Sequence, residues 1–224
     1  MKIQSKLSRF AKTTFLVAAL AAGFVAPVKA ATELNLAILA GIADEDYDGA
    51  QVFKNYVETA SNGSVTVKLF PGAQLCGSAA ECFESMKAGV VDIYNGTAGG
   101  ASVLWKPIQA LDIPYLFSSD RVVQEVLQGP LEQDIRARIM KATQSKIMLM
   151  SIGQTGGWRG ILTKSKPVKS PEDMKGMKIR TIESPIQQTL VRNMGASPTP
   201  LPWSEVYTAA TTGVIEGSDR KSVV

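Results

Sequence analysis

Apolar and polar residues follow two different periods along this chain, and the order in which the periods appear predicts an α/β fold. An apolar run over residues 34–39 predicts a first strand, helical spacing over 44–60 predicts a helix, and alternation over 64–70 predicts a second strand. This order is typical of a βαβ unit. A second helical pattern over 78–88 leads into the apolar run 90–94, for which we predict a buried strand.

Helical patterns dominate the middle of the chain. Residues 120–127 and 130–142 predict two helices, and the apolar run 147–151 predicts a strand after them. The apolar segment 111–117 predicts a packed wall between two lobes. Three glycines within residues 152–158 predict a hinge where the chain crosses from the first lobe to the second.

Strand and helix patterns alternate again in the last third of the chain. Strands are predicted over 160–163, 176–180 and 214–215, and helices over 184–194 and 204–212. The chain is long enough for one large domain or two small ones. We predict an α/β protein with an N-terminal lobe over 31–152 and a second lobe over 153–224.

The first thirty residues carry the pattern of a secretory signal peptide. Basic residues up to Lys12 precede an apolar stretch over 15–26, and Val28-Lys29-Ala30 follows as a small-residue cleavage site. We therefore predict export and cleavage after Ala30. The apolar stretch is shorter than the roughly 20 residues of a membrane-spanning helix, and a retained N-terminal anchor is the alternative.

The charge of the chain depends on that leader. Five of the 24 Lys and Arg residues and none of the 20 Asp and Glu residues lie in the first thirty positions, so the remainder carries 19 basic against 20 acidic residues. The exported protein is close to neutral, and its sequence holds no basic stripe with interleaved aromatic residues. Nucleic acid is therefore not an expected partner.

The two cysteines, Cys76 and Cys82, lie in the exported part. The chain contains no histidine, which argues against a metal site and against a catalytic thiol with an imidazole partner. A local disulfide or two buried free thiols remain. We expect the disulfide, because exported proteins meet an oxidising compartment.

Two features of the chain are candidates for ligand contact. Arg180 ends the predicted strand 176–180, where open α/β sheets bind ligands, and its guanidinium can hold a carboxylate with two parallel donors. The alternative is an arginine on an exposed sheet edge. The glycine-rich loop over 95–101 lets backbone N–H groups approach a ligand, with Gly99 as the candidate, although such a loop is also typical of an ordinary turn.

Several collinear blocks of sequence point to a known family. They are F-P-G-A-Q-L, A-G-V-V-D-I, L-D-I-P-Y-L-F, K-P-V-x-S-P-E-D-M-K-G-M-K-I-R, G-A-S-P-T-P, W-S-E-V-Y-T-A and T-G-V-I-E-G. With these blocks the chain resembles the solute receptors of tripartite ATP-independent periplasmic (TRAP) transporters, the DctP-like family. The resemblance covers residues 34–217 and implies a two-lobed fold like that of periplasmic binding proteins, with doubly wound sheets.

The resemblance implies roles for individual residues. Arg180 matches the arginine that binds the ligand carboxylate, and Arg159, in a G-[aromatic]-R setting, matches one that assists it. Trp203 and Tyr207 lie in the block where aromatic residues wall the ligand. The alternatives are a solvated strand position for Arg159 and core packing for the two aromatic residues.

The function implied by the resemblance is a periplasmic receptor that binds an organic acid and delivers it to membrane permease subunits, without a cofactor, a metal ion or a catalytic residue. The family takes dicarboxylates, 2-oxo acids, sugar acids and aromatic acids. A receptor that reports the same ligand to a membrane sensor is one alternative. An exported enzyme is the other, disfavoured because the sequence lacks histidine and a G-x-S-x-G motif.

The end of the chain departs from the family pattern. After Gly217 the sequence reads Ser218 to Val224, where the resemblance implies a carboxylate-contacting asparagine and further helices and strands. We therefore expect an incomplete reading of a larger gene, with the predicted strand 214–215 leaving unpaired sheet edges exposed.

Overall fold

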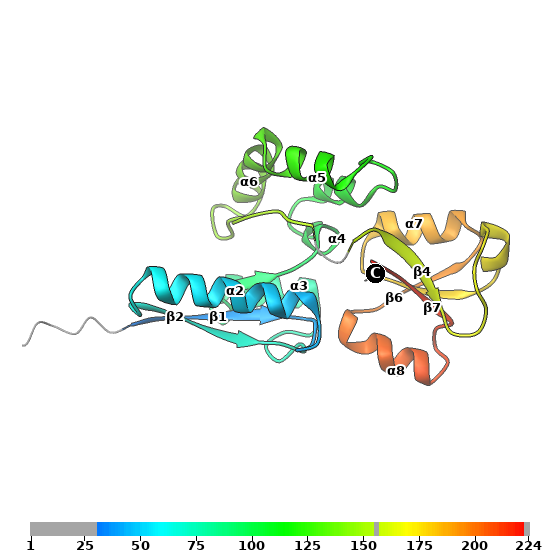
Figure 1. The fold of residues 1–224 in the computed structure, drawn as a ribbon, viewed down its shortest axis with the longest axis horizontal. Helices are drawn as coiled ribbons and strands as arrows, with labels where there is room; N and C mark the ends of the chain where they lie inside the picture. Colours follow the sequence, from blue (N-terminus) through cyan, green and yellow to red (C-terminus); the bar gives the residue numbers. More distant parts are fainter. Residues whose placement is uncertain (1–30, 155–156, 222–224) are drawn as a thin grey trace, which may run out of the picture. The chain divides into compact units, whose positions relative to one another are not determined.

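The computed structural model describes residues 31–154 and 157–221. The predicted signal peptide, two residues of the predicted hinge, 155 and 156, and residues 222–224 lie outside this range. The described strands form two sheets with helices packed on them (Figure 1). From Thr32 onward the contacts group the chain as one compact unit, so the boundary between residues 152 and 153 stays a prediction.

The first sheet holds three parallel strands in the order β2-β1-β3. Its elements in chain order are β1 (Thr32–Ile38), α2 (Glu45–Ala60), β2 (Val65–Phe70), α3 (Ala79–Lys87) and β3 (Ile93–Asn95). The predicted βαβ unit is confirmed. Leu36 and Ile38 of β1 and Val67 of β2 are buried in one cluster with Ala50 of α2, which is why alternation in the strand and helical spacing in the helix were visible.

The predicted strand over 90–94 is shorter in the structure and begins only at Ile93. Gly89 ends α3 with φ of +75°, and Val90 is 53% exposed. Val91 is buried beside the two cysteines rather than paired in the sheet. The first part of the apolar run thus lies in the turn after α3, and only its end belongs to the strand.

Helices form the middle of the chain. They are α4 (Ala98–Ala101), the 3₁₀ helix η1 (Lys106–Asp112), α5 (Asp120–Leu127) and α6 (Pro130–Ala142). The predicted bounds of α5 and α6 are confirmed, because both ends carry clear signals. The Ser119 hydroxyl accepts from the backbone N–H of Val122 to cap α5, and Pro130 opens α6 at its first position.

The predicted strand over 147–151 is wrong. Ile147 is buried against Ile135 and Ile139 of α6, and the segment has no strand partner among the described residues. Instead, Arg136 donates from Nη2 to the carbonyl oxygen of Met150 at 2.7 Å. The segment is apolar because it covers helices.

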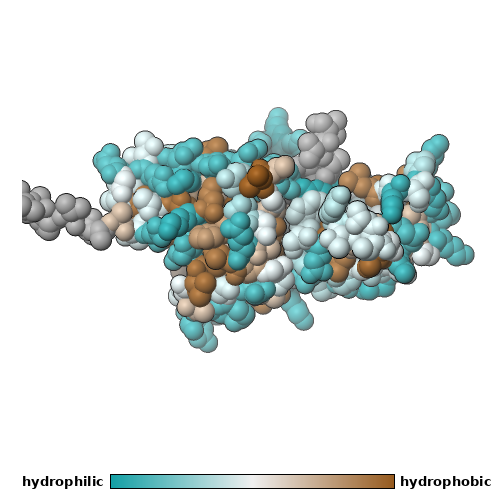
Figure 2. Space-filling model, turned by 90° about the horizontal axis from the view of Figure 1, so that it is seen from below, coloured by the Kyte–Doolittle hydropathy of each residue, from teal (hydrophilic) through white to brown (hydrophobic). Residues whose placement is uncertain are grey.

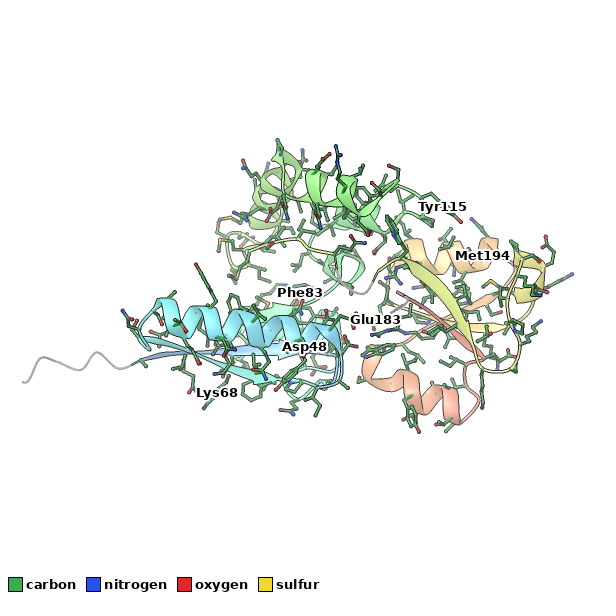
Figure 3. The ribbon with its side chains drawn as sticks, viewed as in Figure 1. Asp48, Lys68, Phe83, Tyr115, Glu183 and Met194 are labelled. Carbon is green, nitrogen blue, oxygen red and sulfur yellow. A yellow bond between two sulfur atoms is a disulfide. The ribbon has the colours of Figure 1, made fainter. Side chains whose placement is uncertain are left out.

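The predicted wall over 111–117 is wrong for most of its length. Leu111 packs against the helical core, but Ile113 and Leu116 are largely exposed, and Tyr115 is fully exposed (labelled in Figure 3). Exposed apolar side chains also occur elsewhere, and Figure 2 shows brown apolar patches among teal residues on one face of the molecule.

The second sheet holds four strands in the order β4-β7-β5-β6. Its elements are β4 (Arg159–Thr163), η2 (Pro171–Met174), β5 (Lys178–Thr181), α7 (Pro185–Asn193), β6 (Ser197–Pro200), η3 (Trp203–Glu205), α8 (Val206–Thr211) and β7 (Gly217–Lys221). Strand β5 runs parallel to β6 and β7, and β7 runs antiparallel to β4. Met174, Ile179 and Val191 form the core beneath it.

The last strand begins later in the chain than predicted and lies inside the sheet rather than at its edge. Ile215 is buried with Val206 and Ala209 in a cluster beside α8, and the strand itself begins at Gly217. It lies between β4 and β5, so the expectation of unpaired edges there is wrong. A side chain at Gly217 would place its Cβ 2.6 Å from the carbonyl oxygen of Leu162, which explains why glycine starts the strand.

Candidate functional site

A cavity of about 110 Å³ lies where the two sheets present the carboxyl ends of parallel strands. The first sheet contributes the segments after β1 and β3 and the start of α2. The second contributes the ends of β5 and β6 and residues of β4 and β7. Ligands of open α/β sheets bind at this kind of edge, and the cavity is therefore the candidate site.

Arg180 lines this cavity from the end of β5 and is only 4% exposed. Its Nε donates to the carbonyl oxygen of Leu201 at 2.9 Å, which fixes the plane of the guanidinium. Among the described residues, its terminal nitrogens Nη1 and Nη2 have no hydrogen-bond partner. Two parallel donors are thus available on the cavity side, as a bound carboxylate requires.

Burial lowers the pKa of Arg180 to about 10, and the positive charge of Arg159 adds to this effect, while Asp219 opposes it. The guanidinium is nevertheless protonated at neutral pH. Because desolvation makes the lone positive charge unfavourable, an anion that enters the cavity gains more from Arg180 than it would from an exposed arginine.

Arg159 lies beside Arg180 but already has a partner. Its Nη1 donates to Oδ2 of Asp219 on the neighbouring strand β7 at 3.2 Å. The Asp219 side chain is 2% exposed, and that of Arg159 is 25% exposed. The structure thus brings the two predicted arginines together and pairs one of them with a buried acid.

Arg220 is a third guanidinium in the cavity, and sequence reasoning missed it. Its Nη2 donates to Oδ2 of Asp44 at 2.7 Å, and Glu45 lies 3.9 Å away. Asp44 is the N-cap of α2, so this ion pair joins β7 of the second sheet to the first sheet's side of the cavity. No signal in the sequence marks Arg220, since the polar run Ser218 to Lys221 carries no strand period.

Trp203 forms a wall of the cavity from η3. The guanidinium carbon of Arg220 lies 3.6 Å from the centre of its ring, and that of Arg180 lies 5.6 Å from it. Both distances are within the range of cation–π attraction. Trp203 thus lines the cavity next to two of its arginines, and its expected role as a wall for the ligand stays a prediction.

Tyr207 and Gly99 do not line the cavity. Tyr207 lies on α8 and is 80% exposed. Gly99 is buried in α4, where a Cβ would lie 2.5 Å from the side chain of Ile182 and 2.6 Å from that of Asp112. The glycine therefore permits close packing of α4 against the start of α7, and it is the neighbouring Gly100 that reaches the cavity.

Acidic residues surround the arginines. Five of them line the cavity: Asp44, Glu45, Asp46, Glu183 and Asp219. Glu183, labelled in Figure 3, follows the end of β5. Burial raises the pKa of Tyr94, and the negative charges of Glu183 and Asp46 add to it, so this phenol stays protonated and can donate a hydrogen bond.

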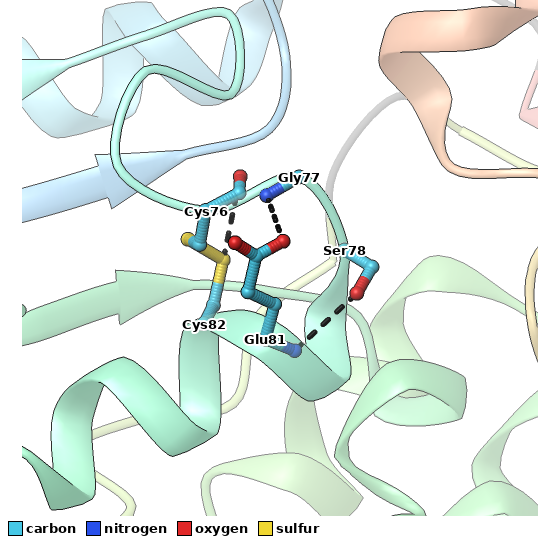
Figure 4. The surroundings of a disulfide bond; sticks show 5 residues. All are labelled: Cys76, Gly77, Ser78, Glu81 and Cys82. Carbon is cyan, nitrogen blue, oxygen red and sulfur yellow. Dashed lines mark hydrogen bonds between the residues drawn. A yellow bond between two sulfur atoms is a disulfide. The ribbon is translucent and has the colours of Figure 1, made fainter.

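The predicted disulfide between Cys76 and Cys82 is present, with both cysteines buried (Figure 4). Ser78 caps α3 by accepting from the backbone N–H of Glu81, whose carboxylate accepts from the backbone N–H of Gly77 at 2.7 Å. The disulfide and this capping arrangement hold the start of α3 in place. The first residue of that helix, Ala79, lines the cavity.

Neither a metal centre nor a membrane span emerges from the part of the chain that the structure covers. No three histidine, cysteine, aspartate or glutamate side chains within residues 31–154 and 157–221 are arranged to hold a metal ion. None of the helices in those ranges combines the length and apolarity needed to cross a membrane.

A family model described as bacterial extracellular solute-binding protein, family 7 (DctP) matches residues 39–221. The match includes strand β7, so the expectation that the resemblance ends at Gly217 is wrong. The physical reason is that β7 completes the sheet that carries the arginines.

Individual proteins agree with the family match. The 2,3-diketo-L-gulonate-binding periplasmic protein of Escherichia coli K12 is 29% identical over 199 residues, which are 89% of this chain and 59% of that protein. A TRAP periplasmic solute-binding protein of Bradyrhizobium sp. BTAi1, in complex with D-galacturonate, is 29% identical with a TM-score of 0.76 and covers 84% of this chain and 61% of that one.

A third similar protein, a TRAP periplasmic solute-binding protein of Sulfurospirillum deleyianum with bound succinate, is 25% identical with a TM-score of 0.74. The alignment covers 86% of this chain and 60% of that one. These structures confirm the predicted α/β fold of the periplasmic-binding-protein kind. The chain spans about three fifths of the length of the relatives it matches.

Proposed function

We propose that this chain, which belongs to the bacterial extracellular solute-binding proteins of family 7, captures a small organic acid and delivers it to the membrane permease subunits of a TRAP transporter. The observation that carries the proposal is Arg180. It is a buried guanidinium in a cavity, and its two terminal nitrogens have no hydrogen-bond partner among the described residues. A carboxylate that binds there replaces the lost hydration of the guanidinium with two charge-assisted hydrogen bonds.

Two neighbours support Arg180 in this proposal. Arg159 adds positive potential while its own hydrogen bond goes to Asp219, so its role is auxiliary. Trp203 provides a flat apolar wall and holds the guanidinium planes by cation–π contact. Tyr207 and Gly99 have no part in the proposal, because neither lines the cavity.

The proposed receptor binds its ligand without chemical change. Support comes from the family description, which is that of a solute-binding protein, and from relatives that are named for the solute they bind. Incubation of the protein with its acid, followed by mass spectrometry of the released ligand, should return the acid unchanged. A new product that depends on the protein would establish an enzyme instead.

We also propose that the protein acts in the periplasm after cleavage behind Ala30. The basic start, the apolar stretch and the Val28-Lys29-Ala30 site support this location, as does the extracellular character of the family. N-terminal sequencing of periplasmic protein should begin at Ala31. A sequence that begins at Met1 would contradict cleavage.

Substitution of Arg180 tests the proposed function. A thermal-shift screen of organic acids on the 224-residue chain first identifies the acid, and calorimetry then measures its Kd for wild type, Arg180→Ala and Arg180→Lys. Loss of the guanidinium should cost about 2–5 kcal/mol, or about thirty-fold to several-thousand-fold in Kd, because the bound anion is left unpaired. Lysine should also bind poorly, since it lacks the planar fork.

The matched control is Arg192→Ala. Arg192 is an exposed arginine in the last turn of α7 and does not line the cavity, so its loss should leave Kd within about threefold of wild type. The proposed site is wrong if folded Arg180→Ala also binds the acid within threefold of wild type. Rescue by Arg180→Lys alone would reduce the role of Arg180 to simple charge attraction.

A further inference from the structure

The three arginines of the cavity are not equally available to a ligand. Arg159 is paired with Asp219 at 3.2 Å, and Arg220 is paired with Asp44 at 2.7 Å. Within the part of the chain that the structure describes, Arg180 donates only to a backbone carbonyl oxygen, which carries no net charge. One guanidinium of the three is therefore free to neutralise an incoming anion.

The remaining acids of the cavity make a second anion unfavourable. Besides Asp44 and Asp219, three carboxylates line the same space: Glu45, Asp46 and Glu183. With three arginines against five acids, the lining is negative by two charges when all are ionised. A carboxylate accepts hydrogen bonds and cannot donate them, so ligand groups near these acids must be donors.

Resting on the function proposed above, we propose that the ligand carries one carboxylate, held by Arg180, and hydrogen-bond donors at its other end, held by the acids of the cavity. The donors are hydroxyl groups, as in a polyhydroxy acid, or an ammonium group, as in a zwitterion. A dicarboxylate is a poor ligand, because its second charge meets carboxylates whose neighbouring arginines are already paired.

The experiment uses four acids with the same five-carbon backbone. Pentanoate has one carboxylate and no donor, glutarate has two carboxylates, D-ribonate has one carboxylate and hydroxyl groups, and 5-aminopentanoate has one carboxylate and an ammonium group. Calorimetry on the 224-residue chain gives the Kd of each. We expect D-ribonate or 5-aminopentanoate to bind at least about tenfold more tightly than pentanoate and glutarate, because like charges in contact are strongly disfavoured.

The order within the favoured pair identifies the source of the donors. Tighter binding of 5-aminopentanoate assigns an ammonium group, and tighter binding of D-ribonate assigns hydroxyl groups. Glutarate binding as tightly as either of them would overturn the inference. If glutarate binds best and Arg180→Ala abolishes that binding, the proposed receptor function stands and only the ligand class is wrong. Failure of all four acids to bind overturns the inference, and failure of every acid in the thermal-shift screen as well contradicts the proposed function itself.

Asp44→Asn sharpens the test, because it removes the nearer of the two acids that pair with Arg220 and leaves only the more distant Glu45. Asparagine keeps a side-chain oxygen for the N-cap of α2, so the helix should survive while the negative charge is removed. The Kd of glutarate relative to that of pentanoate should improve by about tenfold, since the cavity loses one negative charge and Arg220 loses its nearer partner. An unchanged ratio would show that the pairing of Arg220 does not limit the charge of the ligand.

Asp48→Asn is the matched control. Asp48 is an exposed acid in the same first turn of α2, labelled in Figure 3, and it does not line the cavity. Removal of its charge changes the net charge of the protein by the same amount. The ratio of the glutarate and pentanoate Kd values should stay at the wild-type value.

Discussion

The two sheets contribute opposite charges to the cavity. Among the described residues that line it, all three arginines come from the second sheet, whereas the first sheet's side contributes acids from the start of α2 and no cation. Arg220 connects the two sides by pairing with Asp44 at 2.7 Å and, more distantly, with Glu45 at 3.9 Å. In the proposed receptor, the second sheet would therefore hold the carboxylate, and the first sheet's side would set which groups the rest of the ligand must offer.

The two sheets also differ in what an internal strand buries. Strand β1 lies between its neighbours and buries apolar residues such as Leu36 and Ile38. Strand β7 also lies between two neighbours, yet it buries Ser218 and Asp219. A buried acid in the middle of a sheet is stable only when it is paired, and Arg159 is that partner. The central strand of the first sheet thus serves packing alone, whereas that of the second sheet also holds a buried ion pair beside the cavity.

The largest stability effect should come from Ile179→Ala in the second sheet. Ile179 is fully buried in β5, and its truncation leaves a cavity in the core, so the free energy of unfolding should fall by about 2–5 kcal/mol. Urea denaturation measures the loss. Leu162→Ala in β4 of the same sheet is the control, because Leu162 is 55% exposed and its removal should cost well under half as much. Equal losses for the two variants would contradict the assigned core.

Gly217→Ala tests the closeness of β7 to β4. The new Cβ would lie 2.6 Å from the carbonyl oxygen of Leu162, so the strand must shift, and the free energy of unfolding should fall by about 1–3 kcal/mol. Gly160→Ala is the control, since nothing lies within 4 Å of its Cβ position. Thermal unfolding of both variants separates the outcomes, and a stable Gly217→Ala protein would show that β7 pairs more loosely than described.

Removal of the disulfide should destabilise the first sheet's side by a smaller amount. The loop between Cys76 and Cys82 is short, so the chain-entropy contribution is only about 2 kcal/mol, and a double Cys→Ala variant should fold with a lowered midpoint in urea. The Kd for the acid should stay near the wild-type value because Arg180 lies in the other sheet. Loss of binding in the folded variant would show that the two sheets are coupled through α3.

The smallest effect is expected from pH. The pKa of Arg180 is lowered to about 10, so the guanidinium is protonated below that value, and an aliphatic carboxyl group is ionised above about pH 5. The Kd should therefore stay constant from pH 6 to about pH 9 and rise as Arg180 loses its proton near pH 10. Calorimetry across this range checks it. A Kd that changes tenfold between pH 6 and pH 8 would assign binding to a different titrating group.

Much of the framework was visible in the sequence because local signals agree with the fold. The bounds of α5 and α6 follow from Ser119, from Pro130 and from helical spacing, and none of these depends on distant residues. Arg180 was a candidate because it ends an apolar strand before a helix. The pairing of Cys76 with Cys82 followed from their nearness in the chain and from export.

The strand predictions that were wrong rested on short apolar runs, which occur in segments packed against helices as well as in strands. In the runs 147–151 and 214–215, Ile147 and Ile215 pack against helices, and period alone does not distinguish such a segment from a strand. Gly99 was a candidate because glycine permits close approach to a ligand. Other atoms do come close to Gly99, but they belong to the side chains of Ile182 and Asp112.

Strand β7 and the charge balance of the cavity were decided by tertiary structure. The run Ser218 to Lys221 has no hydrophobic period, and it becomes a strand because β4 and β5 offer hydrogen-bonding edges on both sides. Arg220 then lies 2.7 Å from Asp44, which is 176 positions earlier in the chain. The sequence by itself determined that a guanidinium is present at the end of β5. Only the fold determined that its two companions are neutralised, because ion pairs form between side chains that the chain brings together from distant positions.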